Sequence, residues 1–169
     1  AASSGQQGAW RKGLQERQEV SAVTKAAWAD ERCPIIDGVL FADGRIIVLE
    51  STPLEDGRVL VRALLESTID SYLNHNADGW MSLVRCAKCS IDETSQQVVV
   101  GEASMGSDGF VALCDASDNL VWVLISQISD PFFRVSYERE SDTIAADSSS
   151  GHTWRIPRER PHEVTVVER

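Results

Sequence analysis

Apolar and polar positions follow two different patterns along this chain, and the change between them falls near Pro34. Before it, good helix formers dominate, and Leu14 and Trp28 belong to an apolar stripe at helical spacing. We therefore predict an amphipathic helix within residues 13–31. The Cys-Pro step at the end of this segment disfavours helical backbone ahead of the proline, so the helix should end there.

After Pro34, β-branched runs alternate with Asp-Gly pairs. Asp43-Gly44 separates the run 35–41 from the run 45–49. Asp-Gly between apolar runs is typical of a two-residue hairpin turn in which both central residues have positive φ. We therefore predict hairpin turns at Asp43-Gly44 and near Ser117–Asn119, as parts of an antiparallel meander.

Turn-forming residues also separate the predicted elements in the rest of the chain. Residues 58–75 fit both a strand and a helix face, and we predict a strand to about residue 65, then a short helical turn or loop through Asn76. The Ser/Asp-rich stretch 140–150 predicts a loop or a wide hairpin end. Further strands are predicted at Trp80–Cys86, Gln97–Gly101, Phe110–Cys114, Leu120–Ser126, Phe132–Glu138, His152–Ile156 and Glu163–Val167.

These elements predict an α+β fold, a mainly antiparallel, curved β-sheet meander with an N-terminal helix. The 169 residues match the commonest size of one domain. Residues 1–9 begin with small polar side chains and are predicted to be a disordered N-terminal segment. Residues 10–169 are predicted to form a single α+β domain.

The charge narrows the classes of partner. The chain has 26 acidic and 16 basic residues, a net charge of −10. Phosphate groups repel carboxylates, so the composition argues against nucleic acid and anionic membranes as ligands. It favours a basic protein partner, although the acidity equally serves solubility. No run of 18 apolar residues occurs and the N-terminus lacks a signal-peptide pattern, so we expect a cytoplasmic protein with reduced cysteines.

One cysteine motif has a recognised spacing. Cys86 and Cys89 form a Cys-x-x-Cys pair, which supplies half of a zinc site, and no second such pair is present. Cys33 and Cys114 are the remaining candidates to complete it in space. A thioredoxin-like redox pair should open a helix, and the residues after Cys89 have no helical apolar stripe. We predict no bound metal and no cofactor, with a zinc site as the alternative.

No catalytic motif is present. The chain lacks a Gly-x-Ser-x-Gly elbow, a His-Glu-x-x-His zinc motif, a phosphate-binding loop and a calcium loop. Its three histidines, His75, His152 and His162, are each predicted to be ordinary surface residues. We expect a protein that is not an enzyme. A site assembled from scattered residues, with a Cys/His or Asp/His pair, stays open as the alternative.

Carboxylates in turns and two tryptophans beside polar residues are the candidate partner-binding residues. Alternate turns of a meander project to the same edge, so these carboxylates are expected to gather there and to attract a basic surface. The tryptophans could anchor the complex, with core packing as their alternative role. The candidates are Asp56, Asp92, Glu93, Asp108, Asp118, Trp80 and Trp154.

The segment Phe110–Val135, a strand–turn–strand that closes on Ser-Asp-Pro-Phe, resembles segments of small bacterial immunity proteins. These are encoded beside polymorphic toxins of contact-dependent or secreted systems. The tail, with Thr-Trp-Arg-Ile-Pro at 153–157 and His-Glu-Val-Thr-Val at 162–166, is similar to their closing strands, and the resemblance covers about a third of the chain. It implies a cytoplasmic, non-enzymatic inhibitor that occludes the active site of a cognate toxin. The acidic charge suits a cationic nuclease as that toxin. The competing hypotheses are a small enzyme and a zinc-stabilised interaction module.

Overall fold

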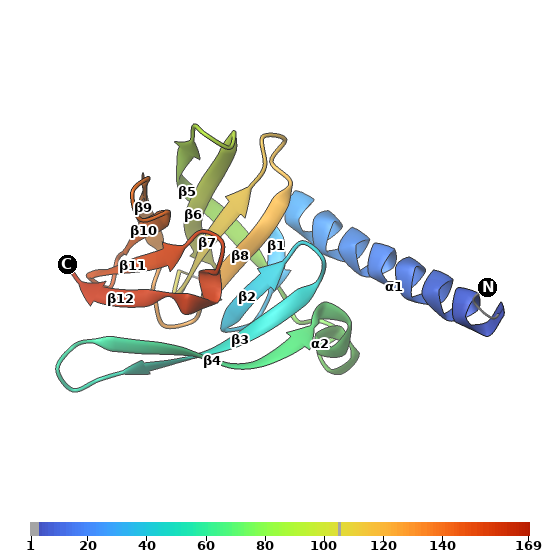
Figure 1. Cartoon of the computed structure of the whole chain (residues 1–169). Coiled ribbons are helices and arrows are strands. Elements are labelled where there is room, and N and C mark those ends of the chain that lie inside the picture. Colours follow the sequence, from blue (N-terminus) through green and yellow to red (C-terminus); the bar gives the residue numbers. More distant parts are fainter. Residues whose placement is uncertain (1–3, 105) are drawn as a thin grey trace.

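The computed structural model describes residues 4–104 and 106–169, and two antiparallel β-sheets make up most of it (Figure 1). In chain order the elements are α1 (Ser4–Ala29), β1 (Arg32–Pro34), β2 (Gly38–Phe41), β3 (Arg45–Pro53), β4 (Val59–Thr68), α2 (Ile69–His75), β5 (Trp80–Ile91), β6 (Gln96–Ala103), β7 (Asp108–Cys114), β8 (Leu120–Ser126), β9 (Phe132–Glu138), β10 (Thr143–Ser148), β11 (His152–Pro157), the 3-10 helix η1 (Pro161–Glu163) and β12 (Thr165–Glu168).

The larger sheet has eight strands in the order β1-β5-β6-β7-β8-β2-β3-β4, and the smaller has four in the order β12-β11-β10-β9. The larger sheet is not a simple meander, because β8 pairs with β2, so that Gly38 lies opposite Ile125. The prediction of a mainly antiparallel β fold accompanied by a few helices is confirmed at this level. The short helix expected before Asn76 is also present, as α2, whose first turn is capped by the Thr68 side chain.

Several elements differ from the prediction, and among them β5 runs on to Ile91 instead of ending at Cys86. The N-terminal helix begins at Ser4 and not near residue 13, and it ends at Ala29. The helix therefore includes residues 4–9 of the segment predicted to be disordered, while residues 1–3 lie outside the described part of the chain. The stretch 140–150, predicted as a loop, contains β10, which pairs with both β9 and β11.

The predicted hairpin at Asp43-Gly44 is confirmed, since β2 and β3 pair directly across it. Its turn type is not the predicted one. Gly44 has a φ of 85°, whereas the φ of Asp43 is not positive, and the Gly44 N–H donates to the Phe41 carbonyl at 2.9 Å. The glycine thus follows the tight turn and does not form its centre. The second predicted hairpin, near Ser117–Asn119, joins β7 and β8.

Two apolar cores lie on opposite faces of the larger sheet. The first fills the space between the two sheets and includes Trp122, Phe132 and Trp154. The second lies on the other face, where Trp28 at the end of α1 and Ile69 of α2 cover it. The central strands β7 and β8 are buried on both faces, which explains why their sequences are almost continuously apolar.

The second face is only partly covered. Toward the β4 edge, Leu60, Leu64 and Leu65 are 51–56% exposed, and we call these three residues the leucine strip. Leu65 lies opposite Val48, which packs against the second core, so the strip continues that apolar face. The pairing of β3 with β4 shifts register at this point, and Leu64 is the extra residue of the bulge.

Helix α1 packs against the rest of the molecule through its C-terminal end. Thr24, Ala27 and Trp28 are buried at its C-terminal end, whereas Leu14 is 56% exposed. In Figure 1 the helix projects to one side of the molecule and the β3–β4 hairpin to the other. Neither described helix has the length and apolar character needed to cross a membrane.

Candidate functional site

The predicted carboxylates lie at different ends of the larger sheet. Successive turns of an antiparallel sheet alternate between its ends, so the β5–β6 turn with Asp92 and Glu93 and the β7–β8 turn with Asp118 lie at one end. Asp108 opens β7 at the opposite end, and Asp56 lies at the tip of the β3–β4 hairpin. The expectation that all five gather at one edge is therefore wrong.

At the end that carries Asp92, arginines pair with the two other predicted carboxylates. The Arg85 guanidinium donates to both Asp118 oxygens, at 3.0 and 2.8 Å, and Glu93 forms an ion pair with Arg139. At the hairpin tip, Arg58 pairs with Asp56 at 2.7 Å, and its hydrogen bonds hold the pKa of that carboxyl below its usual value. These carboxylates offer little free negative charge to a partner.

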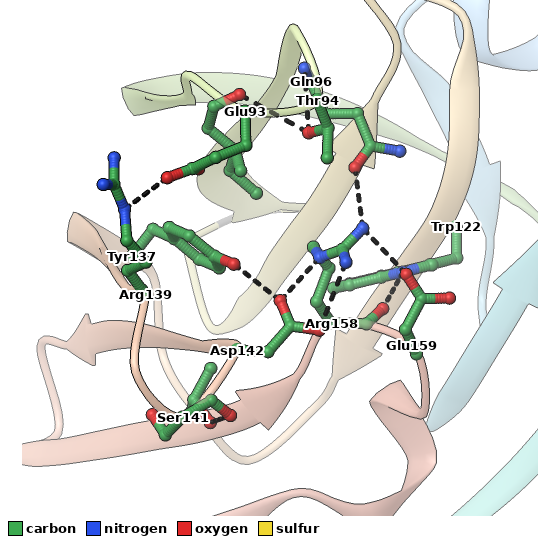
Figure 2. A network of polar contacts seen from close by, with 12 residues as sticks. Glu93, Thr94, Gln96, Trp122, Tyr137, Arg139, Ser141, Asp142, Arg158 and Glu159 are labelled. Atoms are coloured by element: carbon green, nitrogen blue, oxygen red, sulfur yellow. Dashed lines mark hydrogen bonds and ion pairs between the residues drawn. The ribbon is translucent and has the colours of Figure 1, made fainter.

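A polar network around Arg158 joins the two sheets at the end of the larger sheet that carries Asp92 (Figure 2). Arg158 Nε donates to Asp142 at 2.7 Å, and its Nη1 donates to Gln96 of β6 at 3.1 Å. The Tyr137 hydroxyl donates to Asp142 at 2.6 Å, while the Trp122 indole donates to the Arg158 carbonyl at 2.9 Å. The hydrogen bonds from Arg158 lower the pKa of Asp142. We assign this network a structural role, because every charge in it is paired.

The opposite end of the sheet is different. Asp37 in the β1–β2 loop, Asp108 at the start of β7 and Asp130 in the β8–β9 loop form no ion pair with any described residue. An Asp37 oxygen accepts a hydrogen bond from the Gln127 N–H at 2.7 Å, and this bond joins the β1–β2 loop to the β8–β9 loop. A Cβ on Gly109 would lie 2.3 Å from the Asp130 carbonyl oxygen, so only glycine allows this close approach.

Apolar side chains lie exposed beside these carboxylates. Ile35 is 44% exposed, Ile128 is 38% exposed, and Trp80 is half-buried. The Ile35 N–H donates to the Gly79 carbonyl at 2.9 Å, which places Ile35 next to Trp80. We call this surface the acidic end, and it consists of the six residues Asp37, Asp108, Asp130, Ile35, Ile128 and Trp80.

Ionisation of the Asp37 carboxyl is unfavourable in the free protein. Partial burial raises the pKa of Asp37, the Gln127 hydrogen bond opposes this, and the nearby Asp108 raises the pKa further. A carboxylate whose charged form is disfavoured gains from any cation brought close to it. Of the predicted residues, this end contains only Asp108 and Trp80. Sequence reasoning missed Asp37 and Asp130, although both sit in turn motifs, Asp-Gly and Asp-Pro.

Trp154 and the Cys-x-x-Cys pair, which was the alternative zinc site, lie elsewhere in the fold. Trp154 is 1% exposed and packs edge-on against Phe132, with ring centres 5.7 Å apart, so it belongs to the core and not to a rim. Cys86 is exposed and Cys89 is half-buried on β5, and both thiols are free. Within the described ranges, no three His, Cys, Asp or Glu side chains are arranged to hold a metal ion.

The histidines have separate surroundings. His75 contacts the Ser71 carbonyl at 3.0 Å within α2. His152 Nε2 lies 2.8 Å from the Gly57 carbonyl, and so fastens the tip of the β3–β4 hairpin to β11. His162 is partly exposed, and its Nδ1 atom is buried without a hydrogen-bond partner among the described residues.

Two hollows of about 590 and 450 Å³ flank Arg85. The guanidinium between them is already bound to Asp118, and it lies 4.9 Å from the centre of the Trp28 ring. The hollows therefore surround an internal contact. Comparison of the chain with protein-family models, curated proteins and solved structures finds no match.

Proposed function

We propose that the chain is a non-enzymatic binding protein that holds a basic protein partner at the acidic end. The observation that carries this proposal is the combination found there, with three carboxylates that form no ion pair with a described side chain next to exposed isoleucines and a half-buried tryptophan. Carboxylates of this kind speed the encounter with a cationic surface, and apolar neighbours supply contact area after docking.

The distribution of charge supports the same conclusion. Residues 1–131, which build the helices and the larger sheet, contain 19 acidic and 10 basic residues. Residues 132–169, which build the smaller sheet, contain seven and six. The negative potential thus arises mainly from the part of the chain that contains the acidic end. A partner with a basic surface is steered toward that part.

The resemblance of residues 110–135 to immunity proteins supports a narrower proposal, that the partner is a bacterial toxin domain whose active site the chain occludes. Asp130, Ile128 and Asp108 lie in or beside that segment. Under this proposal the acidic end occupies the site at which a cationic nuclease binds its anionic substrate. The chain itself catalyses no reaction.

The test combines capture and kinetics. A partner is isolated from the native host on the immobilised chain, purified, and its association rate is measured at about 50 and 300 mM salt. We expect association to slow at higher salt, and Asp108→Lys to slow it further. Asp92→Lys is the matched control, because it changes the same charge at the other end of the sheet. Equal effects of the two variants, or no effect of salt, would refute the proposed surface. If stoichiometric chain left the partner's nuclease activity intact, the toxin assignment would be wrong.

A further inference from the structure

The leucine strip is an apolar surface that nothing in the described chain covers. Leu60, Leu64 and Leu65 are each more than half exposed, on the same sheet face that α1 and α2 cover over the neighbouring strands. Single exposed leucines are common, but three in one strand mark a contact surface. The opposite face of the same hairpin is packed, because Val59 and Val61 on that face contact the first core. Only the outer face of the hairpin is left bare.

The covering layer on this face is helical. Trp28 of α1 and Ile69 of α2 seal the second core, and the leucine strip is the continuation of that core toward β4. A helix laid along β4 would extend the same layer. The bulge at Leu64 interrupts the regular edge of β4, which disfavours addition of a further strand. The geometry therefore favours a helix as the occupant.

We infer that the occupant is α1 of a second copy of this chain. Among the described side chains of α1, the buried ones lie at its C-terminal end, and the helix from residue 4 to residue 23 projects from the body over about 30 Å (Figure 1). The ten residues of β4 extend over about 33 Å, so the lengths match. In Figure 1 the helix and the hairpin point to opposite sides, so the helix does not reach the strip of its own chain.

The charges of the two surfaces are complementary. Helix α1 contains four basic and two acidic residues in a chain that is otherwise strongly acidic. The segment 54–70, which includes the strip, contains four acidic and two basic residues. Arg58 and Arg62 are already paired with Asp56 and Glu50, so the other carboxylates of the hairpin are left for the helix.

Reciprocal docking gives a closed dimer with two identical contacts, because each copy provides one helix and one strip. Leu14, which is 56% exposed on α1, is an apolar side chain of the helix that such docking covers. The acidic ends take no part in these contacts. The dimer therefore adds to the proposed function and does not depend on it.

The test measures the mass of the full-length chain by sedimentation equilibrium from about 1 to 100 µM. We expect a dimer with twice the 18.6 kDa chain mass. Leu65→Asp and Leu14→Asp should each weaken dimerisation at least tenfold, which is about 1.4 kcal/mol. Val84→Asp is the control, because Val84 is 52% exposed on β5, away from both surfaces. Circular dichroism confirms that each variant is folded.

A mixture of the two variants gives the decisive result. Leu14→Asp keeps an intact strip and Leu65→Asp keeps an intact helix, so together they should form a heterodimer with one good contact. Pairing of β4 with β4 would leave Leu14→Asp dimeric, and pairing of α1 with α1 would leave Leu65→Asp dimeric. Either pattern, or a wild-type chain that stays monomeric at 100 µM, would overturn the inference.

Discussion

Replacing Arg158 by methionine tests whether the network in Figure 2 stabilises the contact between the sheets. Methionine keeps most of the aliphatic stem, and the Trp122 indole can still donate to the main-chain carbonyl at position 158. The substitution removes two hydrogen bonds to Asp142 and one to Gln96. Its effect therefore reports on the guanidinium alone.

The expected loss follows from the burial of the partners. A hydrogen bond to a charged group contributes about 1.5–3 kcal/mol when buried. The Arg158 side chain is 17% exposed, but that of Asp142 is 41% exposed, so water replaces part of what is lost. We expect the free energy of unfolding to fall by about 1–3 kcal/mol at pH 7, measured by urea denaturation.

The dependence on pH provides the check. Arg158 lowers the folded-state pKa of Asp142, so the pair stabilises the fold above the unfolded pKa of the aspartate, about 3.9. This contribution is lost as the pH falls through the lowered folded pKa. The difference between wild type and Arg158→Met should therefore shrink from pH 7 toward pH 3. An equal difference at both pH values, or none at pH 7, would refute the reasoning.

Three further predictions concern the core, the acidic end and the thiols. Trp154→Leu should lower the free energy of unfolding by about 2–4 kcal/mol because it empties a buried site, and chevron or urea measurements check this. Asp37→Asn should raise the melting temperature at pH 7 and have no such effect near pH 3, because ionisation of Asp37 costs stability only above its unfolded pKa; a uniform shift across pH contradicts this. A thiol reagent should label Cys86 in the native protein, whereas Cys114, which is buried with its pKa raised to about 12, should react only after unfolding.

The sequence pattern predicts the strands of the larger sheet better than β10, an inner strand of the smaller sheet. Asp-Gly turns and β-branched runs are local signals, and they locate β2, β3, β7 and β8. Strand β10 has alanine, aspartate and serine at most positions, which are weak strand formers. It forms because β9 and β11 pair with both of its edges and bury Ile144 and Ala146, and no local pattern reports such contacts.

The candidate site was harder to predict for a related reason. Whether a turn carboxylate keeps its charge free depends on an arginine far away in the sequence, as for Asp118 with Arg85 or Glu93 with Arg139. Asp37 and Asp130 become neighbours of β7 only through the loops that the larger sheet brings together. The net charge indicated a basic partner, but only the fold separates paired from unpaired carboxylates.

The pairing of β2 with β8 has a consequence for synthesis of the chain. On the ribosome, β2, β3 and β4 emerge well before β8, the strand that pairs with β2 and is complete only at Ser126. Until then Val39 and Leu40 have no neighbour on one side and remain open to wrong contacts. Pairings so distant in sequence also slow refolding. We therefore expect nascent chains that stop before β8 to be sensitive to protease, and chains that extend beyond Glu168 to resist it.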